Sequence, residues 1–136
     1  MIDERPLPFP DDASAPFWEA CRRRELRMQQ CSGCKKLRFP PRPMCPRCQS
    51  FDSEWVPVSG RGRIYSFVVA HAPVLPAFAG RVPFPIVLVE LDEDAGLRIV
   101  GNLVGQKAPV RIGARVEVAF EEVAPDVTLP QWRVVG

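Results

Sequence analysis

The sequence contains two cysteine pairs of identical spacing, Cys31-Ser32-Gly33-Cys34 and Cys45-Pro46-Arg47-Cys48, with ten residues between them. A C-x-x-C turn directs backbone N–H groups at thiolate sulfurs, and two such turns that face each other complete a tetrahedral site of four sulfurs. We therefore predict that Cys31, Cys34, Cys45 and Cys48 bind one metal ion. Because protein sulfurs would fill all four coordination positions, the metal would be structural rather than catalytic.

Zinc is the metal that we expect, although four thiolates also suit a single iron ion. Four unrelated buried cysteines or two disulfides are the other readings of the pattern. They fit less well with a reducing compartment, where cysteine pairs more often bind metal. The sequence has no signal-peptide pattern and no apolar run near the roughly 18 residues of a membrane span, so we expect a cytoplasmic protein outside the membrane.

The composition favours a small, mainly β protein. The 136 residues suffice for one ordinary domain or two very small ones. Sixteen prolines and nine glycines favour short strands with many corners over a helical bundle. The 18 basic residues are nearly balanced by 16 acidic ones, which argues against a protein that coats nucleic acid.

The segment before the cysteines predicts a flexible arm and one short helix. Residues 1–13 are rich in proline and acid and follow no period, whereas Ser14 is a typical helix start and the helix should run to about residue 24. Phe17 and Cys21 are four residues apart, with Trp18 beside them, and form a narrow apolar stripe. Cys21, the fifth cysteine, is most simply a small buried hydrophobic residue, since a nucleophile would need a neighbouring base or positive charge.

Alternation of apolar and polar residues predicts short strands on both sides of the cysteine block, at 26–31 and 54–58. A break at residues 59–62 then separates residues 14–60, the helix and metal ribbon, from residues 61–136. Five short antiparallel strands in this second part favour a closed OB-fold barrel, with a β-sandwich as the alternative. These strands are expected at 63–72, 85–91, 97–104, 115–121 and 131–135.

Few other residues form a pattern with obvious chemistry. His71 is the single histidine, and a lone histidine at this position could act as a base. We prefer a role in packing or ligand contact, because no neighbouring residues form the pattern of a catalytic triad. The apolar segment 72–85 either folds back into the barrel or is covered by a ligand or partner, and we favour a partner. Arg61 and Arg63, near aromatic residues, suit single-stranded nucleic acid or a small phosphorylated ligand.

Several motifs, in order along residues 14–136, resemble the acyl-CoA-associated zinc-ribbon/OB-fold family, long described as a domain of unknown function. The resemblance implies an N-terminal helix, a rubredoxin-like zinc ribbon and a C-terminal OB barrel. It also implies an accessory partner of thiolase-superfamily enzymes, among them the aldolases of steroid side-chain degradation. The motifs are Pro16-Phe17-Trp18-Glu19, Gln30 to Cys34, Phe39 to Cys48, Ser59 to Phe67, Pro83-Phe84-Pro85 and Gly101 to Val104.

Under this resemblance the chain would be a non-catalytic subunit that helps to bind or channel CoA thioesters, while the partner supplies the nucleophile. The alternatives are a nucleic-acid-binding ribbon/OB module and a rubredoxin-like electron carrier. The family indicates a region rather than roles for the remaining residues. We expect ligand contacts from Arg61, Arg63, Tyr65, His71, Phe78 and Phe84, and partner contacts from Phe17, Trp18, Val74 and Leu75.

Overall fold

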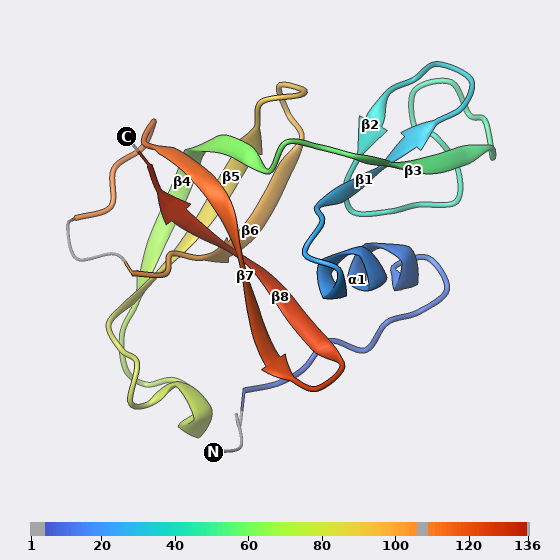
Figure 1. Ribbon diagram of the computed structural model, residues 1–136. Coiled ribbons are helices and arrows are strands. Elements are labelled where there is room, and N and C mark those ends of the chain that lie inside the picture. Colours follow the sequence, from blue (N-terminus) through green and yellow to red (C-terminus); the bar gives the residue numbers. More distant parts are fainter. Residues whose placement is uncertain (1–4, 106–108, 136) are drawn as a thin grey trace.

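The strands form two antiparallel sheets in the computed structural model, which describes residues 5–105 and 109–135 (Figure 1). The smaller sheet carries the cysteine turns and has the strand order β2-β1-β3. Its central strand β1 (Arg27–Cys31) and edge strand β3 (Ser53–Pro57) lie where alternation predicts them. The other edge, β2 (Leu37–Arg38), has only two residues and was not among the predicted strands.

The larger sheet has five strands in the order β6-β5-β4-β7-β8. A parallel bridge between Leu103, just after β6, and Trp132 of β8 joins its two edges, which closes the sheet into a barrel rather than leaving a sandwich. The predicted OB-fold barrel and the mainly β fold class are therefore confirmed. The strands are β4 (Arg61–Ala70), β5 (Phe84–Leu91), β6 (Arg98–Asn102), β7 (Arg115–Ala124) and β8 (Val127–Val134).

The hairpin of β7 and β8 is longer than the sequence pattern indicates. Pairing continues past a bulge at Glu122 to Ala124, which pairs with Val127. The adjacent acids Glu121 and Glu122 interrupt the alternation, and therefore they resemble a turn in the sequence. In the apolar segment between β4 and β5, the chain forms a short 3₁₀ turn, η1 (Pro76–Phe78).

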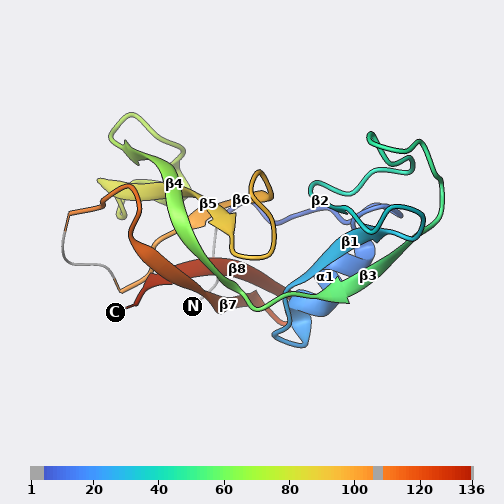
Figure 2. The same cartoon turned by 90° about the horizontal axis from the view of Figure 1, so that it is seen from above.

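Helix α1 (Ala15–Arg22) lies under the small sheet, next to the barrel, and packs against both β1 and β8 (Figures 1 and 2). Pro16 occupies its first turn, where a missing N–H costs no hydrogen bond. Its buried face consists of Phe17, Ala20 and Cys21, as the apolar stripe predicts. No helix in the described part of the chain is long and apolar enough to cross a membrane.

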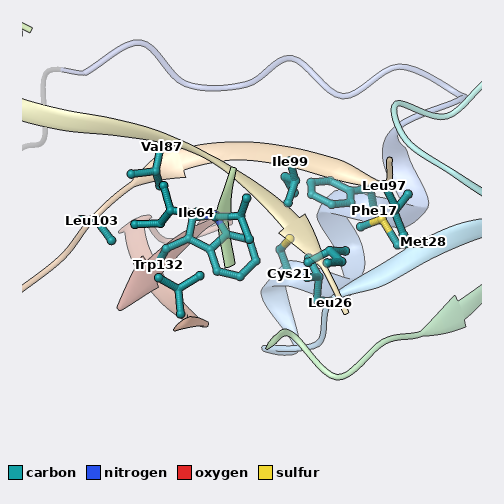
Figure 3. Packing of buried hydrophobic residues seen from close by; sticks show 13 residues of the cluster. Phe17, Cys21, Leu26, Met28, Ile64, Val87, Leu97, Ile99, Leu103 and Trp132 are labelled. Carbon is teal, nitrogen blue, oxygen red and sulfur yellow. The ribbon is translucent and has the colours of Figure 1, made fainter. Parts of the chain in front are cut away.

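A single hydrophobic cluster connects the helix, the ribbon and the barrel (Figure 3). Phe17 and Met28 lie beside Leu97 in this cluster, so residues from all three parts share one interior. Trp132, at 0% exposure, fills the barrel interior beside Ile64. Because a three-stranded sheet of short strands buries little by itself, this shared core is what holds the ribbon against the barrel.

Polar contacts supplement this core. Lys36 Nζ lies 2.8 Å from an Asp94 carboxylate oxygen, which ties β2 and its turn to the β5–β6 connection. The predicted flexible arm, residues 1–13, falls partly outside the described residues. Within the described part, Arg5 Nη1 lies 3.2 Å from Glu121 Oε1 of β7. The small sheet ends at Pro57 and the large one begins at Arg61, on either side of the boundary predicted after residue 60.

Replacing Gly101 by alanine should destabilise the barrel. A Cβ atom at this position would lie 2.8 Å from Trp132 Cδ1 and 3.2 Å from the Pro130 carbonyl oxygen, which is closer than packed atoms approach. We expect Gly101→Ala to lower the free energy of unfolding by about 1–3 kcal/mol in urea titrations of the metal-bound protein. Gly80→Ala is the matched control, since nothing lies within 4 Å of its added Cβ. Equal stabilities of the two variants would contradict this packing.

Candidate functional site

The four paired cysteines come together at one end of the ribbon. Their sulfur atoms all lie within 4.8 Å of one another. Cys31 Sγ is 3.4 Å from Cys48 Sγ, and Cys34 Sγ is 3.7 Å from Cys45 Sγ. Zinc–sulfur bonds of about 2.3 Å in a tetrahedron place sulfurs about 3.8 Å apart, so the clustering of these four sulfurs suits one zinc ion.

The two cysteine turns repeat the same backbone geometry. Lys35 N–H donates to the Cys31 carbonyl, and Gln49 N–H donates to the Cys45 carbonyl at corresponding positions. Lys35 and Gln49 both adopt the left-handed conformation, with φ of 65° and 66°. This conformation lets the backbone reverse directly after the second cysteine of each pair. The Cys34 N–H points at Cys31 Sγ at 3.5 Å, and hydrogen bonds to this sulfur, with the Cys34 N–H as the main one, lower the pKa of the Cys31 thiol to about 6. Thiolate formation there favours metal binding.

The donor set therefore fits a structural zinc ion. Cys31 and Cys45 are buried, and the four thiolates leave no open coordination position for water or substrate. When bound, zinc would cross-link the two turns, and this region of the chain contributes few buried apolar side chains of its own. The role of the zinc ion is therefore to stabilise the fold of the ribbon.

Cys21 does not belong to the metal site. It is fully buried on α1 within the shared hydrophobic cluster. Burial away from water raises the pKa of its thiol to about 12, so it stays protonated at neutral pH. A protonated, inaccessible thiol is a packing residue, in agreement with the simpler of the two sequence interpretations.

The six residues predicted to contact a ligand do not lie in one place. Arg61, Arg63 and Tyr65 are exposed along the beginning of β4. His71 follows the other end of this ten-residue strand. A ten-residue strand spans about 30 Å, so a compact ligand could not reach both the arginines and the histidine, and only an extended one could.

Phe78 and Phe84, by contrast, lie together. Their rings stack with centroids 5.6 Å apart, and both line a cavity of about 290 Å³ at the mouth of the barrel. Arg81 and Asn102 also line this cavity, next to Arg5. Among the predicted ligand contacts, this pair has the clearest surface on which a ligand could bind.

Arg63 already has partners within the chain. Its Nη2 donates to Glu90 Oε1 at 3.0 Å, and this contact holds the pKa of the Glu90 carboxyl below its usual value. Arg98 Nε lies 3.6 Å from the other Glu90 oxygen, while the Arg98 guanidinium sits 3.6 Å from the centre of the Tyr65 ring. Sequence reasoning missed Glu90 and Arg98. These two residues can be identified only from the pairing register of β4, β5 and β6, which places them beside Arg63 and Tyr65 and is known only once the strands are paired.

The residues predicted to contact a partner differ in their exposure. Phe17 is 3% exposed and packs into the chain's own core, with Trp18 and Phe39 against its ring. Trp18 is partly buried and lines a shallow apolar depression of about 310 Å³. Val74 is half-buried, whereas Leu75 is 58% exposed at the tip of the segment before η1.

Removal of one metal ligand should release the metal. We expect Cys34→Ser to lose stoichiometric zinc on dialysis against a chelator and to melt at a lower temperature, because three thiolates bind zinc less tightly and less of the binding energy stabilises the fold. Zinc content by atomic absorption and thermal unfolding measure both effects. Cys21→Ala, which removes a sulfur outside the site, should keep one zinc per chain. A red protein with bound iron would contradict the zinc assignment.

The burial of Cys21 can be tested by its reactivity. A shift of its pKa from 9.0 to about 12 lowers the thiolate fraction about a thousandfold near pH 8, so a disulfide reagent should leave Cys21 unmodified in the folded zinc-bound protein. Unfolding in urea should expose it to rapid modification, as peptide mapping would show. Rapid labelling of Cys21 in the folded state would show that α1 is not docked as described.

Family models match most of the chain. Residues 18–54 match the model described as the ChsH2 rubredoxin-like zinc ribbon domain, and residues 55–121 match the model of the ChsH2 C-terminal OB-fold domain. The match of residues 18–54 and the clustered sulfurs together support the structural zinc assignment.

Similar proteins have names from CoA-thioester metabolism. The chain is 45% identical over 131 residues to a probable enoyl-CoA hydratase alpha subunit of Thermomonospora curvata; the match covers 95% of this chain but 40% of that protein. The chain thus spans about two fifths of the length of that relative. It is 30% identical over 120 residues to the benzoylsuccinyl-CoA thiolase subunit BbsA of Thauera aromatica, covering 86% of this chain and 72% of that protein.

Comparison with solved structures agrees with the sequence matches. A chain of the structure described as Ltp2-ChsH2(DUF35) aldolase is 43% identical and superimposes with a TM-score of 0.84, covering 93% of this chain and 98% of that chain. The resemblance inferred from the motifs is therefore confirmed. With its four-cysteine ribbon, its closed barrel and these matches, the chain belongs to the ChsH2 (DUF35) family of zinc-ribbon/OB-fold proteins.

Proposed function

We propose that this chain is a non-catalytic accessory part of a thiolase-superfamily enzyme, such as a thiolase or an aldolase, that acts on CoA thioesters. The observation that carries the proposal is its close match, along 98% of the length, to a chain of the Ltp2-ChsH2(DUF35) aldolase. A relative named as a thiolase subunit supports the same class of partner.

The chemistry of the described residues supports an accessory role. Four cysteines are assigned to the metal, and the remaining Cys21 is buried and protonated. His71 is exposed, and no hydrogen bond joins it to a serine, cysteine or carboxylate within residues 5–105 and 109–135. Acyl transfer and carbon–carbon bond cleavage both need an activated nucleophile or base, so we assign these groups to the partner.

Exposed apolar side chains at one end of β4 and in the following segment supply a surface for the partner. Val68 and Leu75 are 59% and 58% exposed, and Val69 is 41% exposed. Because Val68 and Val69 are consecutive in the strand, their side chains point to opposite faces of the sheet. We therefore define the β4 apolar surface by the two most exposed of these residues, Val68 and Leu75, since exposed apolar side chains of this kind often mark an interaction site. Val74, next to Leu75 in the chain, would extend this surface, while Trp18 would be a second contact.

The cavity lined by Phe78 and Phe84 is adjacent to this segment and is our proposed contact for part of the CoA thioester. Stacked aromatic rings offer apolar area for an acyl or pantetheine chain. Arg61 and Arg63 remain proposed phosphate contacts, and Arg63 would have to share its guanidinium with Glu90. Tyr65 in β4 and His71 just after this strand would contact the ligand or the partner.

Co-expression with a thiolase-superfamily protein of the same organism tests the proposal. We expect the two proteins to co-elute in size-exclusion chromatography. The double variant Val68→Glu/Leu75→Glu should weaken the complex about tenfold or more, because burying a carboxylate in an apolar contact is costly. Ile112→Glu is the matched control, since Ile112 is 67% exposed but lies outside the β4 apolar surface.

Two separately eluting proteins, with the thiolase-like protein fully active alone, would contradict the accessory role. Equal weakening by Ile112→Glu would contradict the assignment of the β4 apolar surface. The variants must bind stoichiometric zinc and show unchanged circular dichroism, so that a loss of complex reports the surface rather than the fold.

A further inference from the structure

A cleft of about 450 Å³ lies between the ribbon and the barrel, apart from the aromatic cavity and the β4 apolar surface. Its walls come from β2, from the loop that leads to the second cysteine turn, and from the β5–β6 connection. The charged residues that line it are Lys36, Arg38, Arg42, Arg47 and Asp94. Four cations thus face one carboxylate, which Lys36 already engages at 2.8 Å.

Arg38 is the unusual member of this lining. It is 4% exposed, and only its Nη2 finds an acceptor, the Arg42 carbonyl oxygen at 2.8 Å. The buried Nε and Nη1 atoms have no hydrogen-bond partner among the described residues. Three N–H bonds of a charged guanidinium are therefore left unsatisfied within the wall of the cleft.

Such an arrangement is costly unless something else pairs with the guanidinium. Buried polar groups in folded proteins are nearly always hydrogen-bonded, and an unpaired buried charge strongly destabilises a fold. The zinc site does not supply the missing acceptors: Cys45 lines the cleft, but no sulfur accepts from Arg38. Even with the net double negative charge of a zinc–tetrathiolate counted, the cleft remains positive.

We propose that this cleft binds a phosphate group, with Arg38 as the buried anchor and Arg42 and Arg47 as exposed cations at its rim. Phosphate offers several acceptor oxygens, and its geometry matches the paired N–H groups of arginine. The cleft is also large enough for more than an inorganic ion. The phosphate is either free or part of a nucleotide. The site does not depend on the function proposed above.

Binding can be measured on the full zinc-loaded chain without any partner. Titration calorimetry at constant ionic strength, with inorganic phosphate in one arm and adenosine 3′,5′-bisphosphate in the other, should give saturable binding in at least one. Much tighter binding of the bisphosphate would identify a site for a nucleotide-borne phosphate. Equal affinities for the two compounds would identify a site for phosphate alone. In ¹⁵N NMR spectra the Arg38 Nε–H resonance should shift on saturation, because it gains a charged acceptor.

We expect Arg38→Met to weaken binding about tenfold or more, since it removes the charge-assisted hydrogen bonds. If that buried variant fails to fold, Arg42→Gln/Arg47→Gln, which changes exposed residues only, should still weaken binding. Arg111→Gln, another exposed arginine that does not line the cleft, is the matched control. Absence of binding in both arms, or equal weakening by the control, would overturn the proposal and indicate that water fills the cleft.

Discussion

The docking of one short helix into a core shared by both sheets is the contact on which the rest of this structure depends. Phe17 and Cys21 of α1 lie in the same cluster as Met28 of the ribbon and Leu97 of the barrel. An eight-residue helix is not stable by itself, and a small sheet of short strands buries too little to fold alone. Each part therefore obtains its burial from the others, and this fixes how the ribbon is placed against the barrel.

The metal solves a different problem. Between Ser32 and Asp52 most side chains are exposed, and apart from the cysteines this region contributes almost no buried apolar residue. Zinc coordination would replace the missing core there, because binding energy substitutes for apolar burial. Since shape no longer depends on apolar side chains, the loop can carry a high density of basic residues. The positive cleft beside the metal site follows from that freedom.

Much of this architecture could be predicted from the sequence because the deciding signals are local. The C-x-x-C spacing, the apolar stripe at Phe17 and Cys21, and the alternation in the barrel strands each depend on neighbours within a few residues. Strand β2 has two residues, too few for a period to appear, and the Glu121-Glu122 pair resembles a turn although its strand continues. These misses arise where tertiary pairing, not local pattern, determines the structure.

The functional surfaces were harder to predict for the same reason. Proximity in sequence suggested one ligand site along residues 61–84, but an extended strand carries its two ends far apart. The burial of Arg38 depends on how the ribbon packs against the barrel, and nothing in the order of residues distinguishes it from the exposed Arg42.

One face of the barrel illustrates what strand register adds. In the β4–β5–β6 layer, Arg63, Glu90 and Arg98 pair across the three strands, and Tyr65 stacks on Arg98. Farther along β4, Val68 leaves an apolar side chain exposed. A partner that covers the apolar end need not disturb the charged row, whose carboxylate is already neutralised by two arginines. The same sheet can therefore offer an apolar contact at one end and a self-paired polar surface at the other, and Glu90 of that polar surface also accepts from the Gly96 N–H, which lines the positive cleft.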